Sequence, residues 1–96
     1  MFYHIAFLTL ISDLPEDFDD LVDRQLERIR EQCHGLVEIF LKPNISDRGQ
    51  AYTHGMVSRF ESSGAHDDYQ AAEAHQQFKN FMAPYIRDAI FFDSEL

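Results

Sequence analysis

The sequence predicts an α+β domain with the ferredoxin-like order βαββαβ, in which two helices cover one face of a four-stranded antiparallel sheet. Three observations predict this class. The 96 residues are the size of one domain and contain no linker, internal repeat or low-complexity tract, so a single domain is expected over residues 1–96. Two segments carry apolar residues at helical spacing. Four other segments are rich in β-branched and aromatic residues and are bounded by turn residues, which is typical of strands.

The first strand and the first helix occupy the first third of the chain. Phe2–Leu10 is rich in β-branched and aromatic residues, and Ser12-Asp13 follows it, so a strand is expected. Asp13 with Glu16 three residues later has the pattern of a capping box, and Gly35 is expected to end the helix. The apolar face of this helix consists of Leu14, Phe18, Leu21, Val22, Leu26, Ile29 and Cys33.

The rest of the chain predicts two strands, a second helix and a last strand. Leu36–Lys42 and Tyr52–Glu61 are expected strands with a polar loop between them. Ser62-Ser63 can cap a helix that begins near residue 64, and Pro84 is expected to kink this helix because proline lacks a backbone donor. Ile90–Asp93 is expected to be the fourth strand. The helical spacing before it is carried by Phe78, Phe81, Met82, Tyr85, Ile86 and Ala89.

Both faces of the predicted strands are apolar. The first strand places Ala6 and Leu8 on one face and Ile5 and Phe7 on the other, and the second and fourth strands are similar. An antiparallel sheet with one wet face would instead alternate apolar and polar residues. Because two helices can cover only one face, a second copy of the chain is expected on the other. The expected assembly is therefore a homodimer packed sheet to sheet, a dimeric α+β barrel.

Charge and cysteine content exclude several partners. Eight basic and seventeen acidic residues give a net charge of −9, which repels phosphate backbones and anionic membranes, so neither nucleic acid nor membrane is an expected partner. The apolar start of the chain is interrupted by His4 and Thr9, and it resembles neither a membrane span nor a secretory signal. Cys33 is the only cysteine. Without a signal or a disulfide pair, a cytoplasmic location is expected.

Known cofactor and metal motifs are missing. There is no glycine-rich phosphate loop, no nucleophile elbow and no Cys/His metal set, so no cofactor is expected. His4, His54 and His75 are enough histidines for a zinc site, but they lack a ligand spacing such as His at i and i+4 with a Glu, so no metal is expected. His34 and His66 lie in a turn and in a charged helix and are expected at the surface.

Short segments along the whole chain resemble the stress-responsive A/B barrel (Dabb) family. They occur in the order and spacing of that family and are Tyr3-His4-Ile5, Tyr52-Thr53-His54, Phe60-Glu61-Ser62, Tyr69, His75 with Phe78, and Ile90-Phe91-Phe92-Asp93. The resemblance implies a dimeric α+β barrel. It also implies a relation to olivetolic acid cyclase, a plant polyketide cyclase that closes a ring by aldol chemistry without cofactor or metal.

The resemblance assigns candidate roles to single residues. It implies that His75 corresponds to the catalytic histidine of the cyclase and Tyr69 to its tyrosine partner. It also places His4, His54 and Met56 on the wall of the cavity.

Strand alternation supports this cavity, because His4 and His54 are both expected on the helix-facing side with apolar neighbours such as Leu8. Phe78, three residues after His75, is a further expected ligand-binding residue. The two histidines can equally be satisfied core or interface residues.

The chemistry of the implied pair is proton transfer. A histidine with a pKa near 6.5 accepts a proton at neutral pH, and a tyrosine hydroxyl can stabilise an enolate oxygen. Such a pair suits proton abstraction next to a carbonyl, aldol ring closure or elimination. Two departures from the family stand out, namely Leu26 in place of a further tyrosine and Ala72-Glu73 in place of His-Pro.

The second departure concerns geometry. Six residues of unbroken helix span about 600°, which would place Tyr69 and His75 on faces about 120° apart. Residues 71–74 are good helix formers, so a continuous helix is favoured, and the two side chains converge only if the helix breaks.

Three functions are compatible with these observations. The chain is an acid–base enzyme of the cyclase or lyase kind that acts on a small apolar carbonyl compound, a stress-associated dimer that binds such a ligand without chemistry, or a structural dimer. In the structural interpretation Tyr69 packs on the core, His75 caps a helix, and Phe78 belongs to the core with Phe81 and Tyr85.

Overall fold

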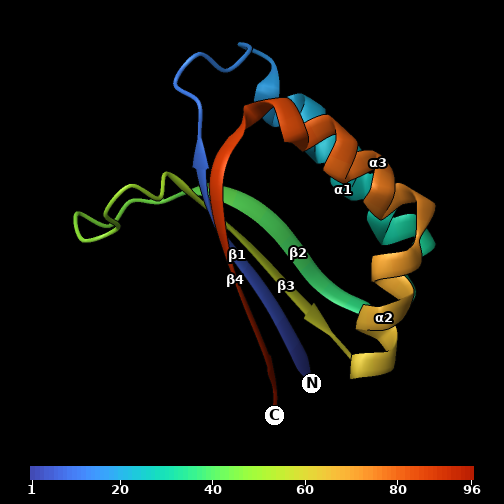
Figure 1. The fold of residues 1–96 in the computed structure, drawn as a ribbon. Helices are drawn as coiled ribbons and strands as arrows, with labels where there is room; N and C mark the ends of the chain where they lie inside the picture. The colour runs from blue at the N-terminus through green and yellow to red at the C-terminus, as the bar shows by residue number, and fades with distance from the viewer.

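The computed structural model describes all 96 residues and confirms the ferredoxin-like α+β fold. Its four strands form one antiparallel sheet in the order β2-β3-β1-β4, and the helices all lie on the same side of this sheet (Figure 1). The elements in chain order are β1 (Phe2–Leu10), α1 (Phe18–Gln32), β2 (Leu36–Pro43), β3 (His54–Phe60), α2 (Ser63–Ala71), α3 (Glu73–Met82), the 3₁₀ turn η1 (Ala83–Tyr85) and β4 (Ile86–Glu95).

The central strand β1 positions the inner face of the sheet. It pairs with β3 on one side and with β4 on the other, so that His4 lies opposite Ser58 and opposite Asp93. The even-numbered residues of β1 from His4 to Leu10 are buried beneath the helices, whereas Phe7 is 45% exposed on the outer face. The sheet is therefore covered on one face only.

Helix α1 begins later than predicted. Its first residue is Phe18, and the capping residue Asp17 makes no side-chain hydrogen bond, so the expected capping box at Asp13 and Glu16 is wrong. The chain first forms a turn, in which the Phe18 amide donates to the Pro15 carbonyl at 3.0 Å. The predicted apolar face is confirmed, since Phe18, Val22, Leu26 and Ile29 are buried.

The last helix ends earlier and the last strand begins earlier than predicted. Helix α3 ends at Met82, and a 3₁₀ turn containing Pro84 leads directly into β4 at Ile86. The expected helix to Ala89 is therefore wrong. The apparent helical spacing of Ile86 and Ala89 has another origin. A register shift between Thr9 and Leu10 allows both residues to pack against the core from a strand. Pairing along the whole of β1 outweighs local helical periodicity here.

Helix α2 begins as predicted. The Ser62 hydroxyl accepts a hydrogen bond from the Ala65 amide at 3.1 Å, which satisfies one of the free donors of the first turn. None of the helices has the length and hydrophobicity that crossing a membrane requires.

Candidate functional site

A cavity of about 310 Å³ lies between the inner face of the sheet and helix α3. This volume is at the lower end of the range of roughly 300–1,000 Å³ that is usual for small-molecule sites. Seven of its twelve wall residues are hydrophobic. The wall consists of His4, Ala6, Leu8, Met56, Gln70, His75, Phe78, Lys79, Met82, Ile86, Phe91 and Asp93. An apolar wall with a few polar groups is suited to a small, largely apolar ligand that also carries a polar group.

A break between α2 and α3 brings Tyr69 and His75 together. Ala72 has an extended backbone (φ −67°, ψ 141°), so the expected continuous helix over residues 71–74 is wrong. The Ala72 amide donates to the Tyr69 carbonyl, and the His75 amide donates to the Ala72 carbonyl, both at 3.1 Å. These hydrogen bonds satisfy backbone groups at the end of α2 and the start of α3, so the helix breaks here without a proline. The ring centroids of Tyr69 and His75 lie 4.1 Å apart.

His75 presents one ring nitrogen as a proton acceptor. Its Nδ1 lies 3.4 Å from the Gln70 carbonyl oxygen, and because a carbonyl can only accept, Nδ1 is the protonated nitrogen. The other nitrogen, Nε2, then carries the lone pair. Burial lowers the pKa of His75, the contact with Gln70 opposes this, and the nearby positive charge of Lys79 adds to it. His75 is therefore neutral at pH 7 and able to act as a base.

Tyr69 packs against the ring of His75 and does not line the cavity. Its side chain is fully buried, and its hydroxyl has no hydrogen-bond partner. The two residues therefore meet ring to ring and not hydroxyl to nitrogen. Burial, with a smaller contribution from Cys33, raises the pKa of the Tyr69 hydroxyl, so this group stays protonated at neutral pH.

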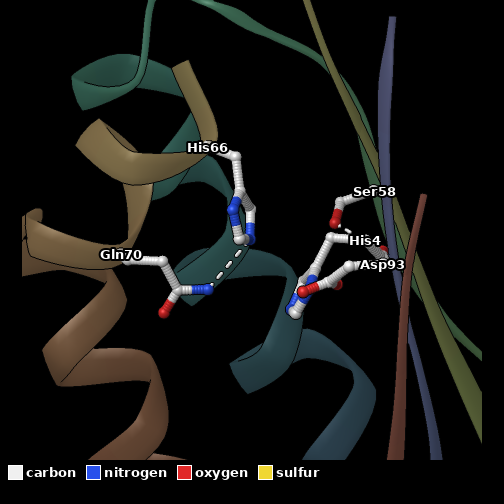
Figure 2. A network of polar contacts seen from close by, with 5 residues as sticks. All are labelled: His4, Ser58, His66, Gln70 and Asp93. Carbon is white, nitrogen blue, oxygen red and sulfur yellow. Dashed lines mark hydrogen bonds and ion pairs between the residues drawn. The ribbon is translucent and has the colours of Figure 1, made fainter. Parts of the chain in front are cut away.

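A second polar group of the cavity is the pair of His4 and Asp93. The two residues are opposite one another on β1 and β4, and His4 Nδ1 donates to Asp93 Oδ1 at 2.5 Å. Figure 2 shows both side chains on the helix-facing side of the sheet. The buried Ser58 hydroxyl donates to the His4 carbonyl at 2.8 Å and fixes the strand at this point. Because Nδ1 is engaged, Nε2 of His4 is the remaining ring nitrogen.

His66 lies in the interior, so its expected place at the surface is wrong. Its ring stacks on Phe2 with centroids 4.5 Å apart and lies 4.8 Å from the ring of His4. The Gln70 amide donates to its Nε2 at 3.0 Å (Figure 2). Burial lowers the pKa of His66, and the neighbouring His4 adds to this.

His54 does not join His4, contrary to the expectation of one shared cavity. It lies opposite Leu8, at the other end of the inner face. There it lines a separate cavity of about 80 Å³ together with Asp19 and Asp23 of α1. Burial lowers the pKa of His54, and the charge of Asp19 opposes this.

Five of the seven predicted site residues line the 310 Å³ cavity: His4, Leu8, Met56, His75 and Phe78. Three polar wall residues were not predicted, namely Gln70, Lys79 and Asp93. A signal for Asp93 exists in the sequence, because an acidic residue two positions from Phe91 lies on the same face of an otherwise apolar strand. Only the pairing register shows that it faces His4.

These features define the class of protein: a ferredoxin-like α+β domain with a small apolar cavity between its sheet and its helices. The sequence profile of the stress-responsive A/B barrel domain (Dabb) matches residues 2–96, and the chain belongs to this family. No protein of established annotation matches the sequence.

Solved structures share the fold at low sequence identity. The protein At3g17210 of Arabidopsis thaliana superposes with a TM-score of 0.85 at 17% identity, over 100% of this chain and 95% of its own. A dimeric ferredoxin-like protein of unknown function from Jannaschia sp. CCS1 gives 0.83 at 21%, over 99% and 98%. Hydroxynitrile lyase from Passiflora edulis gives 0.83 at 16%, over 99% and 92%. At these identities the similarity establishes the fold alone.

Proposed function

We propose that this protein binds a small, largely apolar carbonyl compound in the 310 Å³ cavity and moves a proton on it, with His75 as the general base. One observation carries the proposal. His75 is neutral, lines an apolar cavity, and has Nδ1 committed to Gln70, so that Nε2 is the acceptor that remains for a ligand. A base with this environment suits abstraction of a proton next to a carbonyl group.

The step balances with groups that line the cavity. His75 Nε2 takes a proton from the carbon next to the carbonyl, and the electron pair of the broken C–H bond moves onto the carbonyl oxygen as an enolate. The Lys79 ammonium group, also in the cavity wall, stabilises this oxygen by its positive charge. The proton on His75 then returns to the product, and the step needs no cofactor.

Tyr69 enters the proposal as a positioning residue. Its ring packs against the His75 ring with centroids 4.1 Å apart and is not part of the cavity wall. A direct role for its hydroxyl, as the family resemblance implies, requires that the hydroxyl reach the ligand when the cavity is occupied. His4, Leu8, Met56 and Phe78 are proposed to contact the ligand. One neighbour in fold is named a hydroxynitrile lyase, which supports the view that this fold can hold a catalytic site.

The outer face of the sheet supports a homodimer. Phe7, Ile90 and Phe92 are 45%, 50% and 53% exposed there, and no element of this chain covers them. Two neighbours in fold, from Jannaschia sp. CCS1 and Thermobifida fusca YX, are described as dimeric ferredoxin-like proteins. We therefore propose that a second copy packs on this face.

The test combines ligand binding with proton exchange. A thermal-shift screen of polyketide-like, phenolic and β-keto compounds on the wild type identifies a ligand. Deuterium exchange at its carbon next to the carbonyl is then followed by NMR. His75→Ala is expected to keep most of the thermal stabilisation but to slow exchange by about 100-fold or more, the size of a general-base contribution. The surface variant His34→Ala serves as a matched control and should keep both the thermal stabilisation and the exchange rate of the wild type.

Other results select the alternatives. If ligands stabilise the wild type and His75→Ala equally and neither exchanges deuterium, the protein is a binding dimer without chemistry. If no compound stabilises the wild type, the structural interpretation replaces the proposal.

A further inference from the structure

Three side chains with metal-binding atoms converge beside the cavity. His4 of β1, His66 of α2 and Asp93 of β4 each place one ligand atom so that all three lie within 4.8 Å of one another. Figure 2 shows His66 extending from α2 toward His4 and Asp93 on the sheet. Zinc ligands about 2.0–2.1 Å from the metal are roughly 3.3 Å apart in a tetrahedron, so small side-chain rotations suffice to bring these atoms to such spacing. We propose that His4, His66 and Asp93 bind a divalent transition-metal ion of the zinc class.

The ligand types fit this class of ion. Two imidazoles and one carboxylate are a common donor set for zinc and its transition-metal neighbours, whereas calcium and magnesium prefer oxygen alone. Metal ions bind the neutral form of histidine, and His4 and His66 are both buried. The Asp93 carboxylate contributes the negative charge that a divalent cation needs.

The cluster is held in place before any ion binds. His4 and Asp93 are paired across adjacent strands, so their backbones are fixed by the sheet. The His66 ring is packed between Phe2 and Phe60, with centroids 4.5 Å and 5.3 Å away. Its Nε2 accepts a hydrogen bond from the Gln70 amide at 3.0 Å, which also fixes the orientation of the ring.

The cluster is both accessible and open toward the cavity. The Asp93 side chain is 46% exposed, which gives an ion a path of entry, while the His4 side chain is 7% exposed. His4 and Asp93 also line the 310 Å³ cavity. Three protein ligands leave a fourth position of a tetrahedral ion for water or a ligand, and this position would face the cavity.

The site differs from the histidine trio considered from sequence. His54 lies at the far end of the sheet in another cavity, and His75 is turned toward the Gln70 carbonyl. The proposed site uses Asp93 and His66 in place of His54 and His75. Metal binding here does not depend on the proposed role of His75, because neither His75 nor a small-molecule ligand takes part in it.

The experiment is a titration of chelator-treated protein with Zn²⁺ by calorimetry and with Co²⁺ by visible absorption. The wild type is expected to bind one ion per chain, with Co²⁺ bands typical of four- or five-coordination. His66→Phe keeps the aromatic packing and removes a ligand, and Asp93→Asn keeps the shape and removes the charge. Each is expected to weaken affinity by more than the roughly 10- to 100-fold that loss of an outer-shell partner costs.

His54→Ala is the matched control, because it removes a histidine of the same face outside the cluster, and it should bind like the wild type. His75→Ala should also retain the Co²⁺ spectrum, which separates this inference from the proposed base. The inference is overturned if the wild type binds no ion at a one-to-one ratio, or if His66→Phe and Asp93→Asn bind as tightly as the wild type. Asp93→Asn alters a half-exposed residue, so it carries the test should His66→Phe not fold.

Discussion

The hydroxyl of Tyr69 is the most unusual single group of the molecule. It is buried without a partner, which costs about 1–3 kcal/mol, whereas its ring packs on both Phe60 and His75. Tyr69→Phe keeps the ring and removes the cost, so we expect the free energy of unfolding to stay equal or to rise. Urea unfolding of the wild type, Tyr69→Phe and Tyr69→Leu measures this. A loss of more than about 1 kcal/mol in Tyr69→Phe would mean that the hydroxyl has a partner in solution.

His75 makes stability depend on pH. Burial lowers its pKa in the folded state, the contact with the Gln70 carbonyl opposes this, and the facing groups Lys79, His4 and His66 add to the lowering, whereas the pKa in the unfolded chain is near 6.5. Between these two values the unfolded state binds more protons, so the free energy of unfolding falls as the pH falls below about 6.5. His66 and His54 act with the same sign.

The corresponding prediction is a shallower pH dependence in His75→Gln. Urea unfolding of both proteins at several values between about pH 7.5 and pH 5 measures it, and the wild type should lose stability relative to His75→Gln as the pH falls. Parallel curves would show that His75 keeps its ordinary pKa in the fold.

The residues of the cavity wall were easier to predict from the sequence than the polar contacts that these residues make. The family resemblance placed His4 and Met56 on the wall, and strand alternation supported this by placing His4 and Leu8 on one face of the first strand. His66 was missed because its charged sequence neighbours suggested solvent, although it lies three residues before Tyr69 and therefore on the same side of the helix. Tertiary contacts across the sheet, such as that of His4 with Asp93, cannot be predicted from local sequence patterns.

At the scale of elements, the junction of α2 and α3 determines the site. The residue before a proline prefers an extended backbone, and Ala72 already has one, while Glu73 is the first residue of α3, where proline is favoured. We expect Glu73→Pro to be more stable than Glu73→Ala by about 0.4–1 kcal/mol, because both lose the carboxylate and only proline restricts the unfolded chain. Thermal or urea unfolding of the two variants measures the difference.

The neighbouring position provides the control. The Ala74 amide donates to the Gln32 side chain at 3.0 Å, so Ala74→Pro removes a hydrogen bond and should destabilise the protein. If Glu73→Pro is as harmful as Ala74→Pro, the break between the helices does not persist in solution.

The elements themselves were predictable wherever the pattern was long. The apolar face of α1 and the alternation of β1 extend over several turns or pairs, and both are confirmed. The break at Ala72 was not predictable from the sequence, because residues 71–74 favour a helix and tertiary context overrides this local preference. The start of β4 was missed for a similar reason, since its pairing partner is β1, at the other end of the chain.

At the scale of the whole molecule, the two faces of the sheet differ in what they contact. The inner face lines the cavity and carries the pair of His4 and Asp93. The outer face carries apolar residues that pair across strands, Phe7 with Ile90 and Ile5 with Phe92. An apolar surface of this kind on a 96-residue domain is unfavourable in water, and burial against an identical face removes it for both copies at once.

This argument predicts that light scattering at micromolar concentration gives twice the mass of the chain. Phe92→Glu places a charge among the apolar residues of the outer face, on the edge strand β4 where Phe92 is 53% exposed, and should shift the protein to monomers because the interface would then bury an unpaired charge from each copy. Ile45→Glu is the matched control, since Ile45 is 99% exposed in the loop between β2 and β3, and this variant should stay dimeric. A wild type that is monomeric at micromolar concentration, or a Phe92→Glu variant that stays dimeric, would show that the outer face is not the interface.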